Sequence, residues 1–145
     1  MPLRRALLHT ALWLGVYGFW LFTTHDHHPT PTIAMLATGI MVAGSAAAVY
    51  INALILLPRF AANRLWMRYL LLLGATVAAM TLPVVISIQW IYDALWGPDP
   101  LRFGFWTNAA YDAAGILFHL LLAMGIMWLA RLMRRRSRTG DISAR

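Results

Sequence analysis

The sequence predicts an all-α integral membrane protein, built as a bundle of four membrane-spanning helices. Two apolar runs of 26 residues, 32–57 and 67–92, flank a short arginine-containing link, and neither holds a charge apart from Arg68 at the start of the second. As helices they would be about 39 Å long, more than the roughly 30 Å of bilayer hydrocarbon. The chain is 61% hydrophobic and 12% charged, against roughly 25% charged residues in a soluble domain. Because the apolar runs do not alternate with period two, helices are expected rather than a β-barrel.

Two further apolar runs complete the set. The first follows a basic start and could be a signal peptide, but it carries Trp13, Tyr17 and Trp20 and lacks a small-x-small cleavage site. The last begins at Asn108, a residue type that caps helices. We therefore predict spans at 6–24, 32–57, 67–92 and 108–133, forming one transmembrane domain over 1–133 that is followed by a basic cytoplasmic tail over 134–145.

The arginines predict the orientation. All 12 basic residues are Arg, and all except Arg102 lie near the two termini or in the link between the second and third spans. By the positive-inside rule both termini then face the cytoplasm. We expect a multi-pass protein of the bacterial inner (cytoplasmic) membrane.

The net charge of +7 does not indicate a nucleic-acid partner, because the arginines cluster where topology and lipid headgroups account for them. We expect these side chains to face lipid or a docking protein. The set comprises Arg59, Arg64, Arg68, Arg134, Arg135, Arg136 and Arg138. The chain has no cysteine, so disulfides, thiolate metal sites and a cysteine nucleophile are excluded.

Small residues recur along the second span. Gly39, Ala43 and Ala47 lie four residues apart, as do Gly44 and Ala48. Such spacing lets helix backbones approach closely in lipid. We interpret it as tight packing inside the bundle, and a homodimer face is the alternative.

Two prolines and one carboxylate have local explanations. Pro58 is predicted to end the second helix and Pro83 to kink the third, because proline lacks an amide donor and clashes with the preceding turn. Asp112 would fall in the first turn of the fourth helix, where the helix dipole favours an anion.

Three histidines lie together in the first loop. His25, His27 and His28, beside Asp26, are imidazoles of the kind that bind zinc, copper or nickel. A complete zinc site usually needs four ligands, and no second cluster supplies them unless Asp93 or Asp99 comes close. A solvated polar turn and a pH-sensing loop are the alternatives.

His119 is the ionisable residue closest to the middle of a span. Such residues are costly in lipid and are candidate functional groups. A haem or pigment ligand is one interpretation, although His9 lies too near the cytoplasmic end to supply a second axial ligand. We favour a neutral imidazole, hydrogen-bonded to a hydroxyl of Ser45 or Thr81 on a neighbouring helix. The intramembrane polar set is Ser45, Thr81, Asp112 and His119.

No phosphate-binding loop, nucleophile motif or carboxylate pair occurs in the sequence. We therefore expect a protein that is not an enzyme. No cofactor is predicted, and pigment, haem or metal is left open.

The stretch Tyr50-Ile-Asn52, Leu56-Leu57-Pro58-Arg59-Phe60 and Arg68-Tyr69-Leu70-Leu71-Leu72 resembles the membrane-embedded N-terminal region of sensor histidine kinases that partner LytTR-type response regulators. In that family a Tyr and an Asn near a helix end precede a Leu-Pro-Arg turn. The likeness covers about residues 45–75, and the four-span layout extends it loosely over the chain. The family continues into a phospho-accepting His and an ATP-binding domain. Because this sequence ends at Arg145, the resemblance implies a sensor region without kinase activity.

Three functions remain. The first is a non-catalytic accessory or stabilising subunit of a larger membrane complex, for example respiratory or photosynthetic, that acts through helix packing. The second is a stand-alone sensory or regulatory membrane module related to the sensor regions of histidine kinases. A small transporter is third, because the spans show no matching halves. The expected partners are the lipid bilayer and either a membrane protein or a second copy of the chain.

Overall fold

The computed structural model describes residues 2–97 and 103–143, and places side chains for 3–97 and 103–133. The described part of the chain is helical, without strands. Its elements are α1 (Pro2–Thr24), the 3₁₀ turn η1 (His25–His27), α2 (Pro31–Ile51), the π-helical segment η2 (Asn52–Ala61), α3 (Trp66–Leu95) and α4 (Phe105–Ser143).

Four segments are long and apolar enough to cross a membrane, which confirms the predicted number of spans. They are Leu3–His27, Pro31–Ala61, Trp66–Leu95 and Phe105–Met133. The chain therefore has the character of a multi-pass membrane protein.

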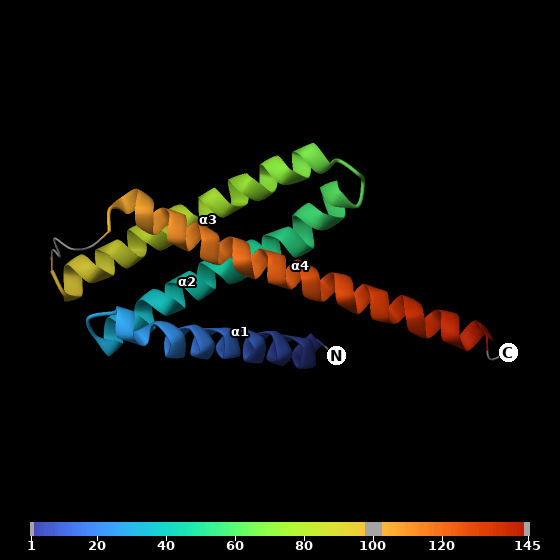
Figure 1. Cartoon of the computed structure of the whole chain (residues 1–145), viewed down its shortest axis with the longest axis horizontal. Coiled ribbons are helices and arrows are strands. Elements are labelled where there is room, and N and C mark those ends of the chain that lie inside the picture. Colours follow the sequence, from blue (N-terminus) through green and yellow to red (C-terminus); the bar gives the residue numbers. More distant parts are fainter. Residues whose placement is uncertain (1, 98–102, 144–145) are drawn as a thin grey trace.

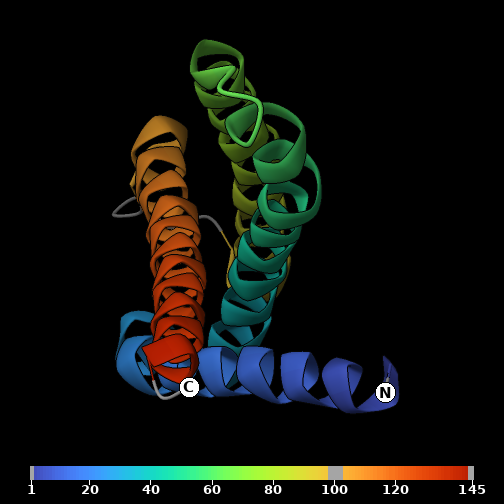
Figure 2. The same ribbon diagram turned by 90° about the vertical axis from the view of Figure 1, so that its right-hand side faces the viewer.

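The helices splay apart rather than running parallel (Figure 1). The start of α1, the link between η2 and α3, and the end of α4 lie at one end of the molecule, on the right in Figure 1. The turn η1 and the start of α4 lie at the other end. Figure 2 shows α4 diverging from the α2–α3 hairpin, with α1 along one side. Among the described elements α2 is central, because it contacts α1, α3 and α4.

The interior is narrow and is built from small and branched side chains. Ala48, Val77, Ile116 and Leu120 form its main cluster, with members from α2, α3 and α4. Larger apolar side chains point outward on all four helices. This distribution suits lipid, which solvates apolar side chains as well as a protein core does, so that close backbone packing holds the helices together.

The two rows of small residues on α2 face different neighbours. An added Cβ at Gly44 would lie 2.5 Å from Val84 Cγ2 on α3, so α2 and α3 approach closely at this glycine. Ala48, one turn further, is fully buried. In the other row, Gly39 lies opposite the ring of Tyr17 on α1. Interior packing is thus found for these residues.

Ala47 is half-buried and Ala43 is exposed. The prediction that Ala43 packs inside the bundle is wrong. The Gly39 row turns away from the interior, because residues four apart advance about 40° around a helix with 3.6 residues per turn.

Pro58 does not end the second helix, contrary to the prediction. The helix continues through η2 with hydrogen bonds that reach five residues back. The amides of Ala62 and Leu65 donate to the carbonyls of Leu57 and Phe60 at 3.0 and 2.9 Å. The wider turn accommodates a proline, and helices often widen in this way around one. The chain reverses at Arg64, whose φ of 60° is left-handed and breaks the helix.

The fourth helix begins earlier than predicted. Phe105 is its first residue, and the amides of Thr107 and Asn108 donate to the Gly104 carbonyl at 3.1 Å. Asn108 is therefore not the N-cap; its side-chain amide donates to the Phe103 carbonyl at 3.0 Å. The backbone of α4 continues to Ser143, through most of the predicted tail, and α3 is continuous through Pro83.

Candidate functional site: a polar cavity between four helices

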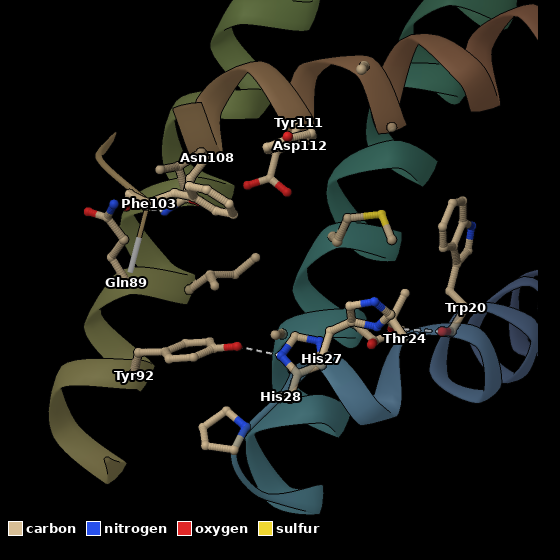
Figure 3. Close-up of a pocket in the computed structure, with 18 of the residues that line it drawn as sticks. Trp20, Thr24, His27, His28, Gln89, Tyr92, Phe103, Asn108, Tyr111 and Asp112 are labelled. Atoms are coloured by element: carbon tan, nitrogen blue, oxygen red, sulfur yellow. Dashed lines mark hydrogen bonds between the residues drawn. The ribbon is translucent and has the colours of Figure 1, made fainter. Parts of the chain in front are cut away.

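A cavity of about 1040 Å³ lies between the four helices at the end of the molecule that carries η1 (Figure 3). Each helix contributes side chains, because the splay opens the bundle at this end. Polar side chains make up about half of the lining: Thr24, Asp26, His27, His28, Thr38, Gln89, Tyr92, Asn108, Tyr111 and Asp112. Most of the others are aromatic or apolar, which is typical of sites for small organic molecules.

Asp112 is the carboxylate that projects from α4 into this cavity (Figure 3). It is partly buried, and no hydrogen bond or ion pair joins it to another described residue. The helix dipole does not account for it, contrary to the prediction. Residue 112 is seven positions after Phe105, two turns into α4, whereas the dipole acts within the first turn.

His119 follows the cavity-lining Phe118 on α4 and is 4% exposed, as the depth argument predicted. Its predicted hydroxyl partner is wrong. The indole N–H of Trp20 donates to His119 Nε2 at 2.9 Å, and His119 Nδ1 lies 2.7 Å from the carbonyl of Gly115. The indole only donates and the carbonyl only accepts, so the imidazole is neutral with its proton on Nδ1. Both ring nitrogens are engaged, and the arrangement leaves neither of them free to coordinate haem or a pigment.

The hydroxyls expected near His119 are satisfied within their own helices. Ser45 is fully buried, with its Oγ 3.8 Å from the sulfur of Met41. Thr81 donates to the carbonyl of Val77 at 2.8 Å. Both are intramembrane polar residues, as predicted, but they form no bridge between helices.

The histidine cluster does not converge on one point. His25 lies 2.8 Å from the Phe22 carbonyl and 3.1 Å from the Asp26 carboxylate. His28 turns toward α3, where its Nδ1 is hydrogen-bonded to the Tyr92 hydroxyl. No group of three potential ligands is placed to hold a metal ion in the described part of the chain. The metal-site hypothesis therefore gains no support from this arrangement.

His28 lies between the first and second spans, at the rim of the cavity. Burial lowers the pKa of its imidazole below the ordinary value of 6.5, and the neighbouring His27 lowers it further. At neutral pH the imidazole is therefore uncharged, and its Nδ1 shares a hydrogen bond with the Tyr92 hydroxyl.

A polar aromatic seam fixes α1 to the bundle. No residue in the most apolar stretch of α1 is buried, so interior packing contributes little to the attachment of this helix. Instead, Trp13 donates to the Tyr50 hydroxyl at 3.0 Å, and that hydroxyl is also hydrogen-bonded to His9 Nδ1 at 3.0 Å. Trp20 makes the third link, to His119. His9, Trp13 and Trp20 share one face of α1, because they are spaced by four and seven residues along the helix.

A second buried pair lies at the far end, beside η2. Tyr69 donates to the Asn52 side-chain carbonyl at 3.1 Å, and both residues are almost fully buried. Sequence reasoning noticed both residues only through the family resemblance. The exposed side chains of Arg59, Arg64 and Arg68 lie at this end, away from the cavity. Those of Arg134, Arg135, Arg136 and Arg138 lie outside the described side chains.

Sequence reasoning did not identify the cavity itself. Its members Trp20, Gln89 and Tyr92 come from segments that read as membrane spans with interfacial aromatics. One signal was present: Gln89 and Asp112 are polar residues inside or beside apolar runs, and such residues mark sites in membrane proteins.

Comparisons with protein-family models, with curated protein sequences and with solved structures find no match for this chain.

Proposed function

We propose that this protein is a sensory or regulatory module of the bacterial cytoplasmic membrane, with both termini in the cytoplasm and the cavity open to the outer side. It binds a small molecule between its helices and responds by changing their packing. The observation that carries this proposal is the cavity lined by all four helices. A molecule held there contacts every helix at once, and can therefore favour one arrangement of the four over another.

Two features supply a route for the response. α1 is attached through a few hydrogen bonds, one of which ends at His119, directly next to the cavity-lining Phe118. α4 is one continuous helix from the cavity to the opposite end of the molecule. A shift of either helix at the cavity is thus carried to the end where the arginines would contact cytoplasmic partners. The resemblance to the sensor regions of histidine kinases supports the same function.

Covalent occupation of the cavity tests this proposal. The chain has no cysteine, so Ala114→Cys places a unique thiol at an exposed, cavity-lining position of α4. The matched control is Ala110→Cys, one turn earlier, which is exposed but outside the lining. Both variants are modified in nanodiscs with a bulky water-soluble thiol reagent, and amide hydrogen exchange is measured along α1 and α4.

The proposal predicts that modification at position 114 changes exchange in α1 and in α4 beyond His119, whereas modification at position 110 changes only its surroundings. Exchange that is unaltered away from position 114 would contradict a sensory role. Reporter fusions at the two termini test the orientation, and a signal from outside the cytoplasm at either end would refute it.

An accessory subunit is the second candidate. The exposed outer face of α1 favours it, because Leu7, Leu14, Phe19 and Phe22 are all more than half exposed. These side chains could contact another membrane protein instead of lipid. Purification in mild detergent separates the two: a stoichiometric partner that is lost on Phe19→Ala with Phe22→Ala supports the subunit, and an unaccompanied protein supports the sensor.

A further inference from the structure

The lining of the cavity has a one-sided charge. Two carboxylates contribute to it, Asp112 from α4 and Asp26 from η1, whereas no arginine or lysine occurs among the described lining residues. His28 is held neutral by burial. This is unusual for a chain with a net charge of +7. The cavity is therefore a locally acidic site, and Asp112 is its more enclosed carboxylate.

Aromatic rings surround the same space. Trp20, Tyr92, Trp96, Phe103, Tyr111 and Phe118 contribute to the lining. The faces of such rings attract cations, most strongly where water is excluded. Figure 3 shows the Asp112 carboxylate directed into the space, with Phe103 on the same side and with Gln89 and Tyr92 on α3 across from it. Rings with an unpaired carboxylate are the combination that recognises ammonium groups.

The size of the cavity indicates the kind of cation. About 1040 Å³ is the volume of a site for a drug-sized organic molecule, far larger than a bare metal ion needs. No described cluster of three ligands is present for a metal. The apolar walls of Met41, Val85 and Ile88 would contact a hydrocarbon or aromatic body.

We propose that the cavity binds an organic cation, an amine or quaternary ammonium compound with an apolar body, whose charged nitrogen pairs with Asp112. Only the biological role of this binding rests on the proposed function. The binding itself depends on the cavity alone. Gln89 and Asn108 also line the cavity, and the carbonyl oxygens of their side chains can accept hydrogen bonds from N–H groups of an amine.

The test uses the full chain in phosphatidylcholine nanodiscs and three probes of one shape: phenethylammonium, 2-phenylethanol and phenylacetate. Isothermal titration calorimetry measures binding, and empty nanodiscs correct for partition into lipid. We expect saturable binding of phenethylammonium, about tenfold or more tighter than either of the other probes, because a charge-assisted contact is worth about 1.5–3 kcal/mol.

Variants locate the site. Asp112→Asn should weaken the binding of phenethylammonium about tenfold or more, and Asp112→Glu should retain most of it. Asp93→Asn is the matched control, because Asp93 is an exposed carboxylate of α3 outside the lining, and its effect should stay within about twofold. Trp96 lies at an exposed helix end, so Trp96→Leu should leave the fold intact. It should weaken the binding of phenethylammonium more than the binding of the other two probes. Equal binding of the alcohol, or binding unaffected by Asp112→Asn, would overturn the assignment.

The two proposals fail separately. If no probe binds but modification at position 114 still alters exchange in α1, the cation assignment is wrong and the sensory role stands. If phenethylammonium binds through Asp112 but modification changes nothing at a distance, the cation site stands and the sensory role is wrong.

Discussion

The indole N–H of Trp20 donates to Nε2 of His119 at 2.9 Å, and so joins the first helix to the last across 99 positions of the sequence. The other ring nitrogen of His119 is bonded to its own helix, so the imidazole has one orientation and one tautomer. This bond holds α1 against the bundle beside the cavity. Several outcomes can be derived from it and from its neighbours.

Removing the Trp20–His119 bond should destabilise the attachment of α1. Trp20→Phe keeps an aromatic ring and removes the donor, and His119→Leu removes the acceptor. A double-mutant cycle on the free energy of unfolding in mixed detergent should give a coupling of about 0.6 kcal/mol, and at most about 1.7. A coupling indistinguishable from zero would show that the two rings are only neighbours.

Tyr50→Phe should loosen α1 at its other end, because the hydroxyl accepts from Trp13 and is also hydrogen-bonded to His9. We expect faster hydrogen exchange in the first half of α1, with α2–α4 unaffected. Tyr17→Phe is the control, since its single bond to the Met35 carbonyl is exposed and long at 3.3 Å. Equal effects of the two changes would refute a special role for Tyr50.

Gly44→Ala should destabilise the α2–α3 hairpin by about 1–3 kcal/mol, because the added methyl overlaps Val84. Val84→Ala in the same chain should restore part of the loss. Gly74→Ala meets nothing within 4 Å and should be neutral or slightly stabilising. Thermal unfolding in detergent compares them, and a Gly44→Ala protein as stable as Gly74→Ala would contradict the close approach.

Acid should destabilise the rim of the cavity through His28. In the folded protein the pKa of the His28 imidazole lies below 6.5, its ordinary value, which it keeps in the unfolded chain. Between the folded-state pKa and pH 6.5 the unfolded chain therefore binds more protons than the folded protein. The contribution of His28 to stability is therefore complete above pH 6.5, and it is lost as the pH falls from 6.5 to the pKa of the folded state. His28→Gln should flatten the dependence of the unfolding free energy on pH. An unchanged slope would mean that other groups produce it.

The sequence predicts the features of this protein that depend on apolar length and depth, but not those that depend on how the helices pack. The four spans follow from apolar length alone, because a bilayer demands it, and the burial of His119 follows from its depth. The partner of His119 could not be predicted, because it depends on which face α1 presents. The apolar residues of α1 surround the helix and favour no face.

The true ends of the second and fourth helices could not be predicted from the sequence either. Pro58 is a helix breaker by its chemistry, and only the wide turn of η2 lets the helix pass it. Asn108 has the chemistry of an N-cap, but Gly104 and Phe103 start the helix one turn earlier. That shift moves Asp112 out of the reach of the helix dipole and into the cavity. The cavity itself arises from the splay of the helices, which no local pattern encodes.

In the proposed function, the contents of the cavity control the packing of α1 against α4. Spin labels at Leu8→Cys and Leu129→Cys, exposed positions far from the cavity, report the separation of these helices by pulsed electron resonance in nanodiscs. Filling the cavity with Ala114→Trp should shift or broaden the distance distribution, whereas Ala110→Trp, which adds the same bulk outside the lining, should leave it unchanged. Identical distributions in all three proteins would contradict the account.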